Sequence, residues 1–142
     1  MQTILVDTCV WYAIFDPRDR PKERDKMIAL GDILENERVV VPWPVTYETM
    51  CTRFTDNRIA LEAFERLLKR PTIQIISDDK YRDEAVDECF ESSLRHKRPL
   101  SLTDCLLRGV LRDPALRIKH FATFNERDFV DVCAPKGIEI FP

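Results

Sequence analysis

The sequence predicts an α/β protein built on a central, mainly parallel sheet, and three observations support this fold class. Helical and extended patterns alternate along the chain, which is the order that βα units produce. The extended segments are short and almost wholly apolar, as in strands of a buried sheet. The chain has 142 residues, of which 44% are hydrophobic, enough to bury a core. We therefore expect a three-layer α/β/α arrangement in one domain over residues 1–142.

Five short segments are predicted as strands, because each is an apolar run rich in β-branched residues. The first run stops at Asp7, and the second stops at Pro42-Trp43-Pro44, since proline cannot donate a ladder hydrogen bond. The predicted strands are Ile4–Val6, Val39–Val41, Thr72–Ile76, Ile118–Thr123 and, as a possible edge strand, Ile138–Phe141.

Helices are predicted between these strands from apolar residues that recur every three or four positions. Val10–Phe15 is so apolar that its helix should be buried against the sheet. The charged, proline-bounded loop Asp16–Pro21 separates it from a helix over Lys22–Glu37, and a helix over Val45–Phe54 carries Glu48. The helix over Lys22–Glu37 should bury Met27, Leu30, Ile33 and Leu34. The next helix, which Pro71 ends, should bury Ala60, Ala63, Phe64, Leu67 and Leu68, and the one after it Tyr81, Ala85, Cys89, Phe90 and Leu94. A last helix is predicted over Leu102–Arg112.

The composition excludes several classes of protein. With 22 basic and 25 acidic residues the formal net charge is −3, which argues against a general binder of polyanions. No apolar stretch approaches the roughly 20 residues that span a bilayer, and the N-terminus has no basic leader, so we expect a cytoplasmic protein without a membrane partner. The five cysteines are scattered and include no Cys-x-x-Cys pair, which favours free thiols over disulfides or structural zinc.

Three acidic residues lie in settings that indicate a functional site. Asp7 directly follows a buried strand, Glu48 has no Lys or Arg three or four residues away, and Asp104 opens a late helix. The carboxyl ends of strands in open α/β sheets line the crevice where ligands bind. Carboxylates that converge there repel one another unless a divalent cation holds them, and oxygen ligands suit Mg²⁺ or Mn²⁺. These residues predict a metal-dependent phosphodiesterase that acts on nucleic acid.

Each of these acids also has a purely structural interpretation. Asp7 is a favoured residue for the N-cap of the next helix, a role that is compatible with metal binding. Asp104 fits a capping box with Ser101, and it stands four residues before Arg108, which is the spacing of a helical ion pair. Glu48 is open to the interpretation of an ordinary exposed side chain.

A second group of candidates follows the strand predicted over residues 118–123. Thr123 and Asn125 carry groups that could hydrogen-bond a metal-bound water or an RNA phosphate, and Asp128 could add a fourth acid. The alternative is a polar turn built from ordinary capping residues.

Other chemistries have weaker support in the sequence. The three glycines are isolated, so there is neither a P-loop nor a dinucleotide-binding turn. The Asp78-Asp79 pair after a strand leaves a phosphoryl-accepting, receiver-like domain as a low-ranking alternative. The basic segment Arg95-His96-Lys97-Arg98 offers Arg95, Lys97 and Arg98 as contacts for an RNA backbone, although such a run is usually a solvated helix end.

Taken together, these motifs resemble the pattern of the PIN-domain family. The resemblance rests on Asp7-Thr8 after the first strand, Glu48 on an early helix, Ser101-Leu102-Thr103-Asp104, and the segment from Ala122 to Phe129. Their order and spacing, and the length of the chain, are similar to those of the VapC-like toxin ribonucleases of toxin–antitoxin pairs. The resemblance spans nearly the whole chain.

This resemblance implies an endoribonuclease that uses one or two Mg²⁺ or Mn²⁺ ions, forms a homodimer and is inhibited by a small antitoxin. Asp7 and Asp104 match the principal metal ligands, Glu48 matches the third acid, and Thr8 lies beside them. Asn125 stands where many members carry a fourth acid, so the second ion depends on Thr123 or Asp128.

The apolar helix that contains Trp11, Tyr12, Ile14 and Phe15 is a candidate site for an antitoxin segment, although these side chains could simply line the core. The alternative function is a non-catalytic PIN-like module that binds RNA or protein.

Overall fold

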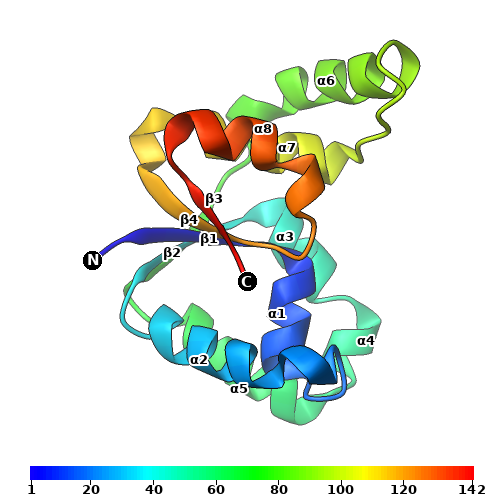
Figure 1. Ribbon diagram of the computed structural model, residues 1–142. Coiled ribbons are helices and arrows are strands. Elements are labelled where there is room, and N and C mark those ends of the chain that lie inside the picture. Colours follow the sequence, from blue (N-terminus) through cyan, green and yellow to red (C-terminus); the bar gives the residue numbers. More distant parts are fainter.

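A computed structural model describes residues 1–142 and contains one five-stranded sheet, parallel throughout, in the order β3-β2-β1-β4-β5 (Figure 1). The fold class predicted from the sequence is confirmed. Each predicted strand is present and differs from the observed one by at most one residue at either end. The strands are β1 Thr3–Val6, β2 Arg38–Pro42, β3 Ile73–Ile76, β4 Ile118–Ala122 and β5 Glu139–Phe141.

Helices cover both faces of the sheet and give the expected three layers. Figure 1 shows α1, α2 and α5 on one side of the sheet and α6, α7 and α8 on the other. No helix combines the length and the apolar character that crossing a bilayer requires. The α-helices are α1 Thr8–Phe15, α2 Arg24–Leu34, α3 Trp43–Thr49, α4 Thr52–Thr55, α5 Arg58–Leu68, α6 Arg82–Leu94, α7 Leu102–Arg112 and α8 Val130–Cys133, and 3₁₀ turns occupy Pro21–Glu23, Asp79–Tyr81, Pro114–Leu116, Glu126–Asp128 and Ala134–Lys136.

The hydrophobic core occupies the space on both sides of the sheet. Its 34 buried residues include the central strands, whose side chains are covered on both faces, as parallel sheets require. On one side Trp11 packs on Phe64, with ring centroids 5.3 Å apart, and on the other Phe121 meets Phe129 edge-on at 4.8 Å. These aromatic contacts fix the helices against the ends of β1 and β4, where the candidate acids lie.

The connections of the sheet reverse direction at β1. From β1 the chain moves outward to β2 and β3, and it then crosses back to β4 on the other side of β1 before reaching β5. Val6 is aligned with Ala122, and the Asp7 amide donates to the Ala122 carbonyl oxygen at 2.9 Å. The carboxyl ends of β1 and β4 therefore form the switch point at which open α/β sheets bind ligands.

The prediction of a single helix over Val45–Phe54 is wrong, because α3 and α4 are separate helices divided at Cys51, whose backbone is extended. The first begins earlier, at Trp43, with a proline in its first turn, where the missing amide hydrogen costs nothing. The Tyr12 hydroxyl donates to the Glu48 carbonyl oxygen at 2.6 Å and lies 2.8 Å from the Cys51 sulfur. This contact from α1 replaces the helical hydrogen bond of the Glu48 carbonyl and stabilises the break.

Two predicted apolar faces are only partly buried. On α2, Met27, Leu30 and Leu34 are buried, whereas Ile33 is half exposed. The physical reason is geometric, since Ile33 is turned about 100° from Leu34 around the helix axis.

On α6, Phe90 and Leu94 are 61% and 74% exposed, although Ala85, and Tyr81 just before the helix, are buried. This helix packs on α7 at the periphery of the molecule, so only a narrow face of it is covered (Figure 1).

Candidate active site

Asp7 lies at the junction of β1 and α1, where it caps the helix. Its side chain is 9% exposed, and it accepts hydrogen bonds from the Thr8 amide at 2.7 Å and from the Thr123 hydroxyl at 2.8 Å. The capping interpretation is therefore correct for this residue. One of its carboxylate oxygens is held by its own helix and the other by the residue that follows β4, which fixes the orientation of the group.

Asp104 occupies the first turn of α7, and its backbone amide donates to the N-cap hydroxyl of Ser101 at 3.0 Å. The side chain makes no ion pair with Arg108, which turns away toward other acids. The helical ion pair considered from the spacing is therefore not formed. The Asp104 carboxylate has no basic partner within the protein.

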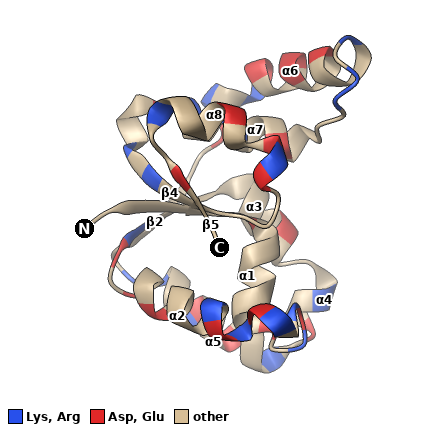
Figure 2. Ribbon diagram, in the orientation of Figure 1, with Lys and Arg blue, Asp and Glu red and all other residues tan.

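Glu48 connects the other two acids through hydroxyl groups. The Thr8 hydroxyl donates to Glu48 Oε2 at 3.0 Å, and the Thr103 hydroxyl donates to Glu48 Oε1 at 2.8 Å. Thr8 follows Asp7 and Thr103 precedes Asp104, so α1, α3 and α7 bring these three acids to one edge of the sheet. Figure 2 shows acidic segments on α3 and at one end of α7, on the side of the sheet where α1 begins.

Thr103 was not among the residues that the sequence singled out as candidates. The available signal is a hydroxyl residue next to each of two acids, Thr8 beside Asp7 and Thr103 beside Asp104. That pattern is too common to identify a site from the sequence alone. It becomes informative only in the structure, where Glu48 lies between the two hydroxyls.

The electrostatic environment opposes ionisation of Asp7 and Asp104. Burial is the largest cause that raises the pKa of Asp7, and the charge of Glu48 adds to it. Burial also raises the pKa of Asp104, to which the charges of Asp7, Asp128 and Glu48 contribute. The charge of Glu48 thus opposes the ionisation of both Asp7 and Asp104, and the charges of Asp7 and Asp128 oppose that of Asp104. A cation bound among them would relieve this repulsion.

The loop after β4 completes this edge of the sheet. The Asn125 amide nitrogen of the backbone donates to the Thr123 hydroxyl at 3.0 Å, and its side-chain amide donates to Asp128 Oδ2 at 2.6 Å. Asn125 therefore orients the hydroxyl that holds Asp7 and also the carboxylate of Asp128. The loop therefore forms a hydrogen-bonded polar turn, as one interpretation of the sequence held, and it also lies beside the acids.

Arg108 fixes α7 and this loop relative to one another. Its side chain is almost fully buried and donates to both Asp131 oxygens at 2.7 and 2.8 Å, to the Asp128 carbonyl oxygen at 2.7 Å and to Glu88. The hydrogen bonds from Arg108 hold the pKa of Asp131 well below its usual range. A buried charge is tolerated only with such partners, so the arrangement at the ends of α7 and α8 is rigidly specified.

The basic segment after α6 is largely engaged in contacts within the protein. Arg95 pairs with Glu91, and Arg98 pairs with Asp131 at 3.3 Å and donates to the Arg127 carbonyl oxygen at 3.1 Å. Lys97, in the left-handed backbone region at φ 50°, forms no ion pair. Of the three predicted RNA contacts, only Lys97 therefore has no competing partner in the protein.

The acids of the receiver-like alternative do not join the site. Asp78 follows the edge strand β3 and accepts two hydrogen bonds of 3.0 Å from Arg82, whose guanidinium lowers the pKa of the carboxyl. Asp79 also pairs with Arg82, at 3.0 Å, so both aspartates are engaged by the same arginine and neither joins the acids at the ends of β1 and β4.

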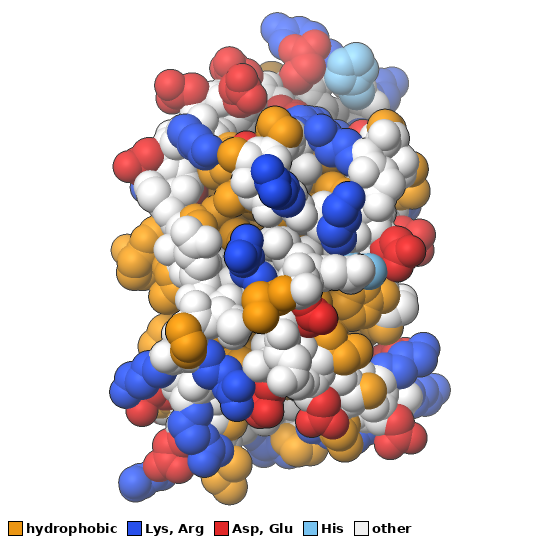
Figure 3. Space-filling model, turned by 90° about the vertical axis from the view of Figure 1, so that its left-hand side faces the viewer, with side chains coloured by type: hydrophobic (Ala, Val, Ile, Leu, Met, Phe, Trp, Pro, Cys, Tyr) orange, Lys and Arg blue, Asp and Glu red, His pale blue; other side chains and the backbone are white.

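The opposite edge of the sheet, on the face shown in Figure 3, carries a different kind of surface. A cavity of about 340 Å³ there is lined by Arg117, Lys119 and Lys136. Its only acid, Asp113, is engaged by Lys80 at 2.6 Å and by the Tyr81 hydroxyl at 2.5 Å.

The residues at the carboxyl edge match the chemistry of a hard divalent cation. Their donors are all oxygen atoms of carboxylates, hydroxyls and an amide, which suit Mg²⁺ or Mn²⁺. In the side-chain arrangement described, no three carboxylate, imidazole or thiol groups stand close enough to share one ion. The threonine hydroxyls between the acids occupy oxygens that a cation would use. The donor types suit such an ion, with Asp7 and Asp104 as the desolvated carboxylates, but the side chains as arranged do not enclose a site for it.

The fold and this edge define a class: a parallel α/β protein with acids gathered at its topological switch point. A family model of the PIN domain matches residues 4–134, and the chain therefore belongs to the PIN-domain family. Members of this family are mostly metal-dependent nucleases. Comparison with curated proteins gave no match.

The raised pKa of Asp104 predicts how stability depends on pH. Because its folded-state pKa lies above the unfolded value, the cost of ionising Asp104 builds up as the pH rises from the unfolded-state pKa to the folded-state pKa, and it is fully present above the latter. Without divalent ions, Asp104→Asn should therefore be more stable than the wild type to urea at pH 7.5. The advantage should vanish near pH 3, where both states of the wild type are protonated.

Asp113→Asn is the matched control for this prediction, since Lys80 lowers the pKa of Asp113 to about 2. This variant should be less stable than the wild type at pH 7.5, and the loss should fade as the pH falls from about 4 toward 2. If the two variants shift in the same direction at pH 7.5, the assigned environments are wrong.

Proposed function

We propose that this protein is a metal-dependent endoribonuclease whose acids Asp7, Glu48 and Asp104 hold Mg²⁺ or Mn²⁺. The observation that carries the proposal is the Thr8–Glu48–Thr103 bridge, which links the neighbours of Asp7 and Asp104 at the switch point. Membership of a family of mostly metal-dependent nucleases supports the reaction class.

In this proposal each residue at the edge has a definite task. Asp7 and Asp104 are the principal ligands, and Thr123 keeps the Asp7 carboxylate in one orientation. Thr8 and Thr103 hold the two oxygens of Glu48 in the same way. A divalent cation held by these residues would supply a Lewis acid, which would make water a stronger nucleophile and stabilise charge on the scissile phosphate.

Asp128, held by Asn125, stands as a further ligand beside Asp104. Asp128 serves as the fourth acidic ligand, because the neutral amide of Asn125 cannot, and a fourth acid would allow a second ion to bind. The number of ions can be read from a titration of Mn²⁺ into wild-type protein and into Asp128→Asn.

The cleavage test compares variants on a mixed pool of tRNA and rRNA with EDTA, Mg²⁺ or Mn²⁺. Asp7→Asn and Asp104→Asn should each lower the cleavage rate by at least about 100-fold, because even groups that merely support a metal ligand contribute about 10–100-fold. Thr123→Val, which removes one donor to Asp7, should cost about 10–100-fold. EDTA should abolish cutting by the wild type.

Glu65→Gln is the control, since Glu65 is exposed on α5 and pairs only with Lys69 at 3.3 Å. It should cleave at the wild-type rate. If a variant of Asp7 or Asp104 cleaves as fast as this control, the substituted residue is not a metal ligand. If pure wild-type protein cuts nothing with any metal, the alternative of a non-catalytic module that binds RNA or protein is favoured.

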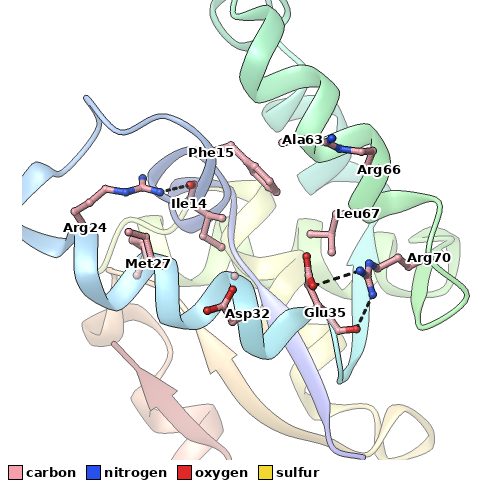
Figure 4. A pocket seen from close by; sticks show the side chains of 12 residues that line it. Ile14, Phe15, Arg24, Met27, Asp32, Glu35, Ala63, Arg66, Leu67 and Arg70 are labelled. Atoms are coloured by element: carbon pink, nitrogen blue, oxygen red, sulfur yellow. Dashed lines mark hydrogen bonds and ion pairs between the residues drawn. The ribbon is translucent and has the colours of Figure 1, made fainter.

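We further propose that the protein is the toxin of a toxin–antitoxin pair and that its partner occupies a groove between α1, α2 and α5. This groove has a volume of about 470 Å³, and Figure 4 shows Ile14, Phe15, Met27 and Leu67 around it. Of the four α1 residues considered for this role, Trp11 is fully buried, Tyr12 binds the α3–α4 break, and Ile14 and Phe15 line the groove.

The rim of the groove is charged. Arg24 donates to the carbonyl oxygens of Ala13 and Ile14, Arg70 pairs with Glu35, and Arg66 forms no ion pair. An apolar floor with a charged rim suits an amphipathic segment, which buries one face and leaves the other in water.

Two isoleucines on α2 provide a matched test of this groove. Ile28 and Ile33 are each 49% exposed, but only Ile28 lines the groove. With a small protein encoded beside this one as the probe, Ile28→Glu should weaken binding at least about 10-fold by introducing a charge that must be desolvated. Ile33→Glu should bind as the wild type does, measured by calorimetry. Equal affinities of the two variants would place the partner elsewhere.

A homodimer is also part of the proposal, with an apolar stripe on α6 as its surface. Val86, Phe90 and Leu94 are spaced by four residues, so they lie on one side of the helix, and they are 40%, 61% and 74% exposed. Sedimentation equilibrium should show a dimer that Phe90→Glu converts to a monomer. Ile59→Glu, at an 81% exposed position of α5, should leave the dimer intact.

A further inference from the structure

An unpaired arginine lies against the loop that carries Thr123 and Asn125. Phe124, between these two residues, is partly buried and packs on the hydrophobic core. The guanidinium carbon of Arg20 lies 3.9 Å from the centre of the Phe124 ring. Arg20 belongs to the loop between α1 and α2, so this contact joins that loop to the carboxyl end of β4, one residue away from the hydroxyl that holds Asp7.

The backbone of Arg20 is in an unusual conformation. Its φ of 48° and ψ of 61° lie in the left-handed region, which L-residues other than glycine, asparagine and aspartate rarely adopt. Pro21 follows and disfavours the ordinary helical alternative. The loop therefore presents the Arg20 side chain in one direction, over the ring.

Two basic residues of the segment between α1 and α2, Arg20 and Lys22, form no ion pair, and only Arg20 lies over an aromatic ring. Arg18 pairs with Asp16 at 3.2 Å, and Arg53, which reaches the loop from α4, pairs with Asp19 at 3.0 Å. Arg20 is exposed and forms neither an ion pair nor a side-chain hydrogen bond within the protein. Stacking on a ring uses the flat face of the guanidinium and leaves the N–H donors at its edge available.

We propose that Arg20, held over the Phe124 ring, binds a backbone phosphate of the RNA next to the scissile one, an inference that rests on the proposed ribonuclease function. The planar fork of arginine matches two phosphate oxygens, and stacking fixes the side chain beforehand, so less rotamer entropy is lost on binding. The gathered acids repel a polyanion, and a cation at their border offsets this repulsion for the approaching chain. Arg20 is thus a positioning residue for substrate.

The test separates charge, planarity and stacking. Binding of a fluorescent, mixed-sequence single-stranded RNA is measured in the Asp104→Asn background, and kcat and KM are measured in the otherwise wild-type enzyme. Arg20→Ala should weaken RNA binding about 5–10-fold and reduce the slope of log K against log salt by about 0.7, the loss of one contact to single-stranded RNA. KM should rise by a similar factor while kcat changes less than about 2-fold.

Two conservative variants and one control complete the design. Arg20→Lys, which keeps the charge but loses the fork, should bind RNA with an affinity between those of Arg20→Ala and the wild type. Phe124→Leu, which keeps an apolar side chain but removes the ring, should weaken binding with Arg20 intact. Arg18→Ala, in the same loop but at a residue already paired, should change neither affinity nor salt slope. The thermal midpoint of each variant is also measured. A variant that is only less stable has a lower midpoint but an unchanged salt slope.

The outcomes distinguish this inference from the proposed function. If the wild type cleaves RNA and Arg20→Ala matches Arg18→Ala in KM and salt slope, the inference is overturned and the nuclease stands. If the wild type binds RNA without cutting it and Arg20→Ala weakens that binding, the inference is supported and the nuclease proposal fails. A wild type that neither binds nor cuts RNA overturns both.

Discussion

The structure depends on the burial of one carboxylate at the end of its central strand. Asp7 is 9% exposed, and transferring a charge from water to such a position costs free energy unless partners replace the lost hydration. The Thr8 amide and the Thr123 hydroxyl replace part of it. The remaining deficit appears as a raised pKa, to which the charge of Glu48 also contributes. The pairing of β1 with β4 makes this arrangement possible, because Val6 and Ala122 are in register and their following residues meet.

Much of this architecture was predictable from the sequence because it follows from local patterns. Each strand is an apolar run with its own boundaries, and Asp7 is found at the switch point because it directly follows one of these runs. Asp7, Glu48 and Asp104 were all expected at this edge, and the hydroxyl bridge brings them there. Their roles as metal ligands remain a prediction.

The features that the sequence did not predict all depend on contacts between distant segments. The break between α3 and α4 is stabilised by Tyr12 of α1, which no local pattern reveals. Arg108 stands four residues after Asp104, yet it pairs with Glu88 and Asp131, because the fold brings α6 and α8 against it. The exposure of Phe90 has the same kind of origin, since periodicity defines an apolar face but not whether a partner covers it.

The bridge through Glu48 has a consequence for the timing of activity. Its donors, Thr8 and Thr103, lie 95 positions apart in the chain, and Asp7 is oriented by Thr123, which is still further along. A nascent chain cannot assemble this edge until β4 has been made and has left the ribosome. Folding units form as synthesis proceeds from the N-terminus, so β1 and β2 exist well before the edge is complete. A chain that is still being translated therefore lacks the assembled group of acids, and incomplete translation products share that deficiency.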